Sequence, residues 1–225
     1  MNILVAAATA LEIPRILRES EHPKVNEEHL HQAKILITGV GSVAATFQLT
    51  KHLLSNNYDL VLGTGVAGSF TPNLLPGEVI VVQKDCFGDL GVVENEKLRS
   101  VFDLNLGNPN EHPFSGGWIE NVLDIAPEFN LKSVNGCTVN TVSSNHATID
   151  RLVNKYKPDI ETMEGAALHY TCKNLNVPFL HLRAVSNFVG ERDKNKWTIN
   201  LALTNLEQVI AKIFCSPTPI SFKDH

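Results

Sequence analysis

Residues 162–187, TMEGAALHYTCKNLNVPFLHLRAVSN, join a helix-like stretch directly to an apolar strand. The first half, MEGAALHYTCKNLN, has the composition of a helix, and the second half, VPFLHLRAV, is typical of a buried strand. This strand ends in Ser186 and Asn187. A buried amide must find partners for its donors and its acceptor. Asn187 therefore either turns the chain here or contacts the edge of a ligand.

Strands and helices alternate along most of the chain. The predicted strands lie within residues 2–8, 33–41, 58–69, 76–87 and 133–144, and the predicted helices within residues 11–19, 42–57, 146–156 and 194–214. Alternation of this kind predicts an α/β fold with a largely parallel sheet that helices cover on both faces. Ligands of such sheets bind beyond the carboxyl ends of the strands.

Length and composition predict one ordinary globular domain over residues 1–225, with 43% hydrophobic residues. A formal net charge of −5 supplies no basic field for nucleic acid or an anionic membrane. The nine His form no HExxH motif and the four Cys form no CxxC motif, so we expect buried thiols and no metal site. With no basic region at the start and no apolar run that could span a bilayer, we expect a cytoplasmic protein.

Two segments depart from the alternating pattern. Residues 88–130 are polar, rich in Gly, Pro and Asn, and weakly periodic, so we expect a loop or insertion. Residues 216–225 read as a frayed tail.

Two glycine-rich motifs follow predicted strands. GVGSVA, residues 39–44, has the form of a dinucleotide-binding turn, but the acidic residue expected at the end of the next strand is missing, since Asp59 lies at its start. We favour a tight turn with close backbone packing. GTGVAGS, residues 63–69, lacks the lysine of a P-loop. It is either an ordinary turn or a place where a flat ligand approaches the backbone.

Three glutamates, Glu12, Glu161 and Glu164, lie near predicted strand ends or helix starts. Glu161 and Glu164 are expected at positions i and i+3 of a helix's first turn, where they would favour the helix dipole. Glu164 leads into small apolar residues, so it would be partly buried and would need a partner, for which Arg183 on the next strand is a candidate. Glu12 is either an exposed residue of a first helical turn or a residue that points beyond the strand ends.

Together these residues resemble the purine nucleoside phosphorylase and nucleosidase superfamily, and within it the futalosine hydrolase branch, over nearly the whole chain. The motifs that carry the resemblance are GVGSVAAT (39–46), GTGVAGS (63–69), LLPGEVIVV (74–82), FGDLGV (87–92), residues 162–187 and SNFVGERDKNKW (186–197). The resemblance implies a three-layer αβα sandwich with a mixed, partly closed central sheet. It also implies a nucleoside substrate, no cofactor, and a homo-oligomer, either a dimer or larger.

The resemblance also implies roles for single residues. Glu12 would orient and deprotonate the attacking water, Glu164 would bind ribose hydroxyls, and Arg183 would hold Glu164 and the water. Asn187 stands where the methylthioadenosine enzymes carry an aspartate that contacts purine N7. The other implied substrate-binding residues are Val40, Val66, Ala67, Gly68, Met163, Ser186 and Arg192. Val66 is a departure, because those enzymes carry a serine there, near the water, and its role must pass to the backbone or another side chain.

The chemistry favours hydrolysis. Cleavage of an N-glycosidic bond places positive charge on the sugar and negative charge on the departing base, so a carboxylate near ribose and a donor near the base stabilise the transition state. Phosphorolytic relatives hold phosphate in a loop after strand one. Here that loop is AAATALE, residues 6–12, which contains no cation and ends in a carboxylate.

The amide of Asn187 favours a 6-oxopurine, since it can donate to O6 and accept from a protonated N7 at once. The expected reaction is hydrolysis of futalosine to hypoxanthine and dehypoxanthine futalosine, in menaquinone biosynthesis. For the aromatic carboxylate of futalosine, the candidate cations are Arg192, Lys97 and Arg99. The alternatives are a methylthioadenosine/S-adenosylhomocysteine nucleosidase, a purine nucleoside phosphorylase, a dinucleotide-binding oxidoreductase and a non-catalytic nucleoside-binding module.

Overall fold

The structure, a computed structural model, describes residues 1–18, 32–123 and 125–215. Its centre is one mixed sheet with strand order β2-β1-β3-β11-β4-β10-β9-β5-β8. Its strands are β1 (Asn2–Ala7), β2 (Gln32–Ile37), β3 (Leu60–Gly63), β4 (Val66–Ser69), β5 (Val79–Asp85), β8 (Ile119–Glu120), β9 (Lys132–Thr138), β10 (Ile160–Thr162) and β11 (Phe179–Phe188). Strands β6 (Gly91–Glu94) and β7 (Lys97–Ser100) form a separate hairpin.

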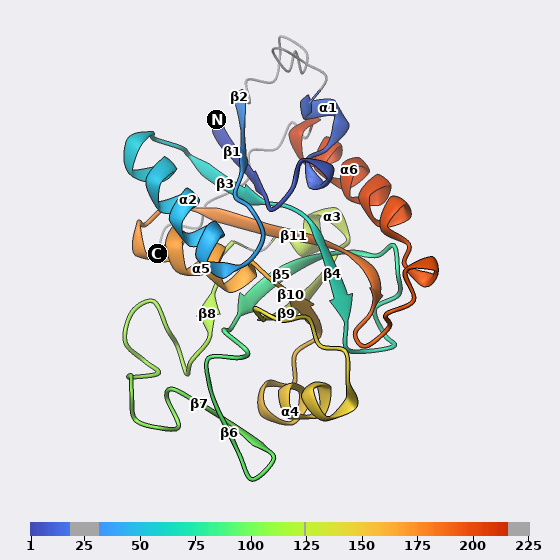
Figure 1. The fold of residues 1–225 in the computed structure, drawn as a ribbon. Helices are drawn as coiled ribbons and strands as arrows, with labels where there is room; N and C mark the ends of the chain where they lie inside the picture. Colours follow the sequence, from blue (N-terminus) through green and yellow to red (C-terminus); the bar gives the residue numbers. More distant parts are fainter. Residues whose placement is uncertain (19–31, 124, 216–225) are drawn as a thin grey trace.

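Part of the sheet closes on itself. Strand β11 pairs with β4 along one edge and with β5 along the other, so β11, β4, β10, β9 and β5 form a ring. Strands β3, β1 and β2 extend the sheet outward from β11 in parallel (Figure 1). The prediction of a mixed, partly closed sheet is therefore confirmed.

Helices cover both faces of the open part of the sheet (Figure 1). They are α1 (Arg15–Arg18), α2 (Ser42–Ser55), α3 (Ala126–Phe129), α4 (His146–Tyr156), α5 (Gly165–Asn174) and α6 (Ile199–Cys215), with short 3-10 turns η1 (Ala10–Glu12) and η2 (Lys194–Lys196). Strand β1 shows why both faces are apolar. Ile3 and Val5 pack in the core under α6, whereas Leu4 and Ala6 pack with α2 and α5. The alternation follows from the two-residue period of a strand, and the αβα layers are as predicted.

Three predicted helices differ from the observed ones. The helix expected over residues 11–19 is split into η1 and α1, with Pro14 between them, and residue 19 lies outside the described residues. The last helix begins at Ile199, after η2. Glu161 is not helical, because it lies in the three-residue strand β10, and Glu164 directly precedes α5.

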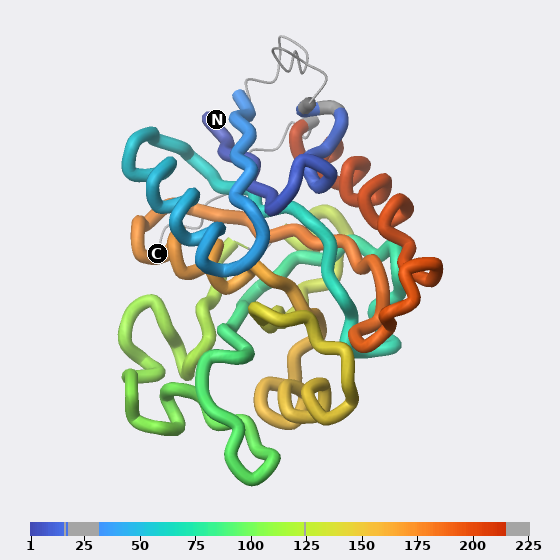
Figure 2. The backbone as a smooth tube through the Cα atoms, viewed as in Figure 1, coloured from blue at the N-terminus to red at the C-terminus, as the bar shows by residue number. Residues whose placement is uncertain are grey.

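Residues 88–130, expected as a loop or insertion, contain the β6–β7 hairpin, β8 and α3. Figure 2 shows the green part of this segment projecting from the end of the molecule opposite α1. Its later part joins the core, since Ile119, Leu123 and Ile125 are buried. Residues 216–225, expected as a frayed tail, lie outside the described residues. In the part of the chain that the structure describes, no helix is long and apolar enough to cross a membrane.

The end of β11 is irregular in a way that matters for the site. Val185 pairs with Ala67 and Asn187 pairs with Gly68, so Ser186 is an extra residue in the ladder. A bulge of this kind turns the strand locally and re-aims its side chains.

Candidate active site

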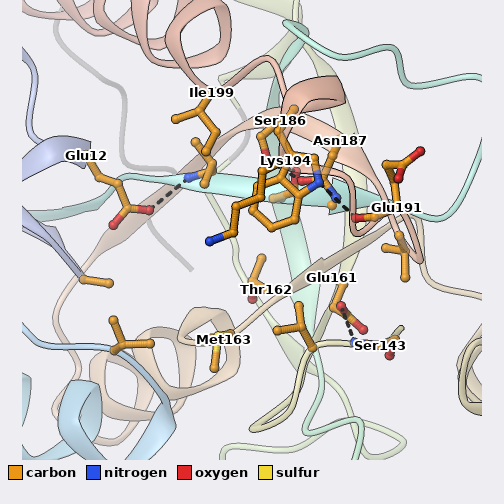
Figure 3. Close-up of a pocket in the computed structure, with 18 of the residues that line it drawn as sticks. Glu12, Ser143, Glu161, Thr162, Met163, Ser186, Asn187, Glu191, Lys194 and Ile199 are labelled. Atoms are coloured by element: carbon orange, nitrogen blue, oxygen red, sulfur yellow. Dashed lines mark hydrogen bonds between the residues drawn. The ribbon is translucent and has the colours of Figure 1, made fainter. Parts of the chain in front are cut away.

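A cavity of about 460 Å³ is lined by residues that follow β1 and by residues of β4, β10 and β11. Ten of the eleven sequence-predicted site residues line it, and Figure 3 shows several of them around the open space. These ten are Glu12, Val40, Val66, Ala67, Gly68, Met163, Glu164, Ser186, Asn187 and Arg192. The eleventh, Arg183, is buried behind two of them. The structure thus brings together residues from both ends of the chain.

Glu12 is held by both of its carboxylate oxygens. Oε2 accepts hydrogen bonds of 3.1 Å from the backbone N–H and the hydroxyl of Thr9. Oε1 accepts one of 3.2 Å from the backbone N–H of Val66. Val66 has no side-chain hydroxyl, but its backbone N–H contacts Glu12. These contacts orient the carboxylate at the edge of the cavity.

Glu164 is buried where α5 begins. Its Oε1 accepts a hydrogen bond of 2.8 Å from the backbone N–H of Gly41. Gly41 has a φ of 93°, a conformation that favours glycine, and immediately precedes α2. Burial raises the pKa of Glu164, and Arg183 and the Gly41 N–H oppose that rise. The turn of residues 39–44 therefore donates a backbone hydrogen bond to the Glu164 carboxylate.

Arg183 lies between the two carboxylates. Its Nη1 is 3.8 Å from Oε1 of Glu12, and its Nη2 is 3.8 Å from Oε2 of Glu164. The predicted pairing of Arg183 with Glu164 is thus present in the fold. A β-carbon on Gly65 would lie 2.0 Å from Nη1 of Arg183, so only glycine fits there. The second glycine-rich motif makes room for this arginine.

Two buried histidines extend a chain of hydrogen bonds from Arg183 into the core. Its Nε donates a hydrogen bond of 2.7 Å to Nε2 of His181. Nδ1 of His181 lies 3.0 Å from Nε2 of His169, whose Nδ1 lies 2.9 Å from the carbonyl oxygen of Ile119. Because arginine only donates, each histidine must be neutral and protonated on Nδ1. Burial supports this, since it lowers the pKa of His169 to about 4 and that of His181 well below its usual range.

Asn187 lies at the other end of the cavity from Glu12 (Figure 3). Its Oδ1 accepts a hydrogen bond of 2.7 Å from the Ser186 hydroxyl, and its Nδ2 donates one of 2.8 Å to the carbonyl oxygen of Phe188. These partners fix which amide atom donates and which accepts. The oxygen has a second lone pair and the nitrogen a second hydrogen for a ligand.

Some residues of the cavity wall were not predicted. Glu161 accepts a hydrogen bond of 3.0 Å from the backbone N–H of Ser143, and burial raises its pKa. The hydroxyl of Ser143 and the second oxygen of Glu161 are buried with no hydrogen-bond partner among the described residues. Lys194 and Trp197 line the cavity from the segment after Asn187. The charge-rich sequence ERDKNKW marks that segment, but it does not indicate which charge faces inward.

Two of the candidate cations lie elsewhere. Lys97 and Arg99 belong to the β6–β7 hairpin, where Arg99 forms a 2.8 Å ion pair with Glu94. None of the described residues of 88–130 lines the cavity. In the single chain, Lys97 and Arg99 therefore do not line the cavity that holds the other predicted site residues. Across the described residues, no group of three or more His, Cys, Asp or Glu could hold a metal ion.

This arrangement suits cleavage at a sugar carbon. Two carboxylates share one arginine at one end of the cavity, and an amide with a fixed orientation stands at the other. The sequence profile of the phosphorylase superfamily matches residues 3–214. The chain therefore belongs to the phosphorylase superfamily.

Individual members of this superfamily resemble the chain over most of its length. The futalosine hydrolase of Thermus thermophilus is 30% identical over 181 residues, which cover 79% of each protein. A 5′-methylthioadenosine/S-adenosylhomocysteine nucleosidase from Chromohalobacter salexigens is 25% identical over 84% of this chain and 86% of its own length. The solved structure of the futalosine hydrolase of Helicobacter pylori has the same fold, with a TM-score of 0.74 at 19% identity, over 94% of this chain and 96% of the other.

Proposed function

We propose that this protein hydrolyses the N-glycosidic bond of futalosine, with release of hypoxanthine and dehypoxanthine futalosine. The observation that carries the proposal is the placement of Glu12 and Glu164 on either side of Arg183, at the opposite end of the cavity from the Asn187 amide. The futalosine hydrolases among the relatives support this choice of substrate.

Glu12 and Glu164 have different roles at the sugar. Glu12, oriented by Thr9 and Val66, takes a proton from the attacking water. Glu164 accepts hydrogen bonds from ribose hydroxyls, and its negative charge stabilises the oxocarbenium character of the transition state. Met163, the residue before it, packs on the sugar. Arg183 bridges the two carboxylates and partly neutralises them.

Asn187 binds the leaving base through its side-chain amide. Its free Nδ2 hydrogen donates to O6 of hypoxanthine, and the free lone pair of Oδ1 accepts from N7–H once N7 has taken a proton from solvent water. Both atoms are held by Ser186 and Phe188, so the amide does not need to reorient when the base departs. Ala67 and Gly68, which line the cavity beside it, leave room for a flat ring.

Hydrolysis rather than phosphorolysis is proposed because Glu12 occupies the end of the loop that would otherwise hold phosphate. The test is release of free base from futalosine, its 6-amino counterpart, methylthioadenosine and inosine, each with and without phosphate. We expect hypoxanthine from futalosine at a rate independent of phosphate. Faster release of adenine from methylthioadenosine, or an absolute need for phosphate, would contradict the proposal and support one of the two alternative activities.

The proposed setting is menaquinone biosynthesis in the cytoplasm. Cys86, Cys137 and Cys172 are free and buried, which suits a reducing compartment. We also propose a homo-oligomer, a dimer or larger, since Val43 and Phe47 on α2 are large apolar side chains that are 83% and 62% exposed. Light scattering of the purified protein tests this, and a mass of one chain would exclude it.

A further inference from the structure

Lys194 places a positive charge in the cavity. It begins η2, lines the cavity, and extends toward the Glu12 side in Figure 3. Its ammonium group makes no hydrogen bond or ion pair within residues 1–18, 32–123 and 125–215. An ammonium group carries three donors, and three donors without protein partners face the space that the substrate would fill.

The neighbouring cations are already engaged. Lys196 forms a 2.9 Å ion pair with Glu191, and the guanidinium of Arg192 lies 5.5 Å from the centre of the Trp197 ring. Arg183 is buried and held by Glu12, Glu164 and His181, as described above. Arg192 and Lys194 are the two cations that line the described cavity wall, and of the two Lys194 is the one with no hydrogen bond, ion pair or cation–π contact to another described side chain.

The walls around Lys194 are apolar. Trp197, Ile199, Leu203 and Leu11 also line the cavity. Apolar walls suit an aromatic ring, and a cation beside them suits an anion on that ring, because a hydrogen bond between charged groups is stronger than one between neutral groups. Lys194 itself is an exposed residue. The site thus matches a ligand group that is both aromatic and anionic.

The position of Lys194 identifies the part of the substrate that it meets. Asn187 marks the base end, and Glu12 and Glu164 mark the ribose. The Lys194 side chain reaches toward the ribose end rather than the base end (Figure 3). The 5′ carbon is joined to C4′, across the ring oxygen from the carbon that carries the base, so a substituent on it extends beyond the ribose.

We infer that Lys194 binds the carboxylate of an aromatic 5′ substituent and thereby selects carboxylate-bearing nucleosides over simple ones. This inference rests on the proposed function, because futalosine is a nucleoside of this kind. It replaces Arg192 as the first candidate for the carboxylate, since Arg192 lies over Trp197.

The test compares Lys194→Met with Lys196→Met, a lysine of the same turn that is paired with Glu191. For each protein, kcat/KM is measured with futalosine, its carboxylate methyl ester and inosine. The loss of a hydrogen bond to a charged group changes affinity by about ten- to a hundredfold. We expect Lys194→Met to lower the ratio of futalosine to inosine by about tenfold or more, and to remove the preference for acid over ester. Lys196→Met should keep both ratios.

Other results would overturn the inference in recognisable ways. An equal loss with all three nucleosides would place Lys194 at the ribose instead. A loss that appears only when phosphate is present would make Lys194 a phosphate ligand. If the wild type releases no base from futalosine, the proposed function fails. The inference is then tested separately by calorimetry, which compares the dissociation constants of futalosine for wild type and Lys194→Met. An unchanged dissociation constant in Lys194→Met would refute it.

Discussion

The side chain of Arg183 donates a 2.7 Å hydrogen bond from Nε to Nε2 of His181. Both residues lie in β11 and both are buried. The bond fixes the plane of the guanidinium, so that its two outer nitrogens face Glu12 and Glu164. Since His181 is itself held by His169, the orientation of Arg183 is set from deep in the core.

Substitution of His181 tests this positioning role. His181→Phe removes the acceptor, and a hydrogen bond to a charged group contributes about 1.5–3 kcal/mol, so kcat should fall roughly ten- to a hundredfold if the loss falls on the transition state. The KM should change little. His181→Gln can still accept through its amide oxygen and should recover part of kcat.

Leu180→Val, in the same strand and equally buried, controls for packing. The measurement is kcat and KM together with the melting temperature. If His181→Phe and Leu180→Val lower the melting temperature alike and leave kcat intact, His181 is structural only.

Glu12→Gln should remove most of the hydrolysis. Loss of a general base typically lowers the rate by ~10²–10⁴-fold. Both oxygens of Glu12 accept from protein donors, so the amide nitrogen of Gln would face a donor and the mutant should also melt at a slightly lower temperature. Glu120→Gln, at an exposed position of β8, is the control. Near-normal turnover in Glu12→Gln would exclude Glu12 as the base.

Asp85 gives a prediction about stability and pH. It is fully buried, and burial raises its pKa to about 7. Its Oδ1 accepts from the Cys86 N–H and the Thr138 hydroxyl, whereas Oδ2 has no hydrogen-bond partner among the described residues. Because the folded state binds this proton more tightly than the unfolded chain does, Asp85 contributes stability at low pH. That contribution is lost as the pH rises from about 4 to about 7.

Asp85→Asn cannot titrate, so its stability relative to wild type should increase by about 2–3 kcal/mol between pH 5 and pH 8. His169 acts in the opposite sense, because its lowered pKa makes the folded state lose stability as the pH falls from about 6.5 to about 4. Comparison of mutant and wild type cancels that contribution. Urea unfolding at the two pH values is the measurement, with Asp59→Asn as the control. An equal difference at both pH values would show that Asp85 does not titrate in this range.

The sequence predicted the parts of the site that local pattern encodes. The end of the first predicted strand led to Glu12, and the small apolar residues after Glu164 led to its expected burial and its pairing with Arg183. The roles of these residues came from the family resemblance. Strand β10 was missed, since three residues cannot show a two-residue period, and Glu161 was consequently assigned to a helix. The histidine chain was not predictable either, because it depends on how α5 packs against β11.

Asn187→Asp should shift the base preference from 6-oxopurines toward 6-aminopurines. The wild-type amide offers a donor to O6 and an acceptor to N7–H. An ionised aspartate offers only acceptors, so it would repel O6 and attract the N6 amino group. One mispaired buried polar group costs about 1–3 kcal/mol, which corresponds to roughly one to two decades in kcat/KM. The aspartate also cannot donate to the Phe188 carbonyl, so some stability should be lost.

The measurement is the ratio of kcat/KM for futalosine and its 6-amino counterpart, in wild type and mutant, across pH. At low pH a protonated aspartate can donate to O6 and hide the effect, so the shift should grow as the pH rises. Asn176→Asp, a turn residue with a φ of 53° away from the cavity, is the matched control and should leave the ratio as it is. If Asn187→Asp has the same ratio as wild type at every pH, Asn187 is a turn residue after the bulge at Ser186 and does not contact the base.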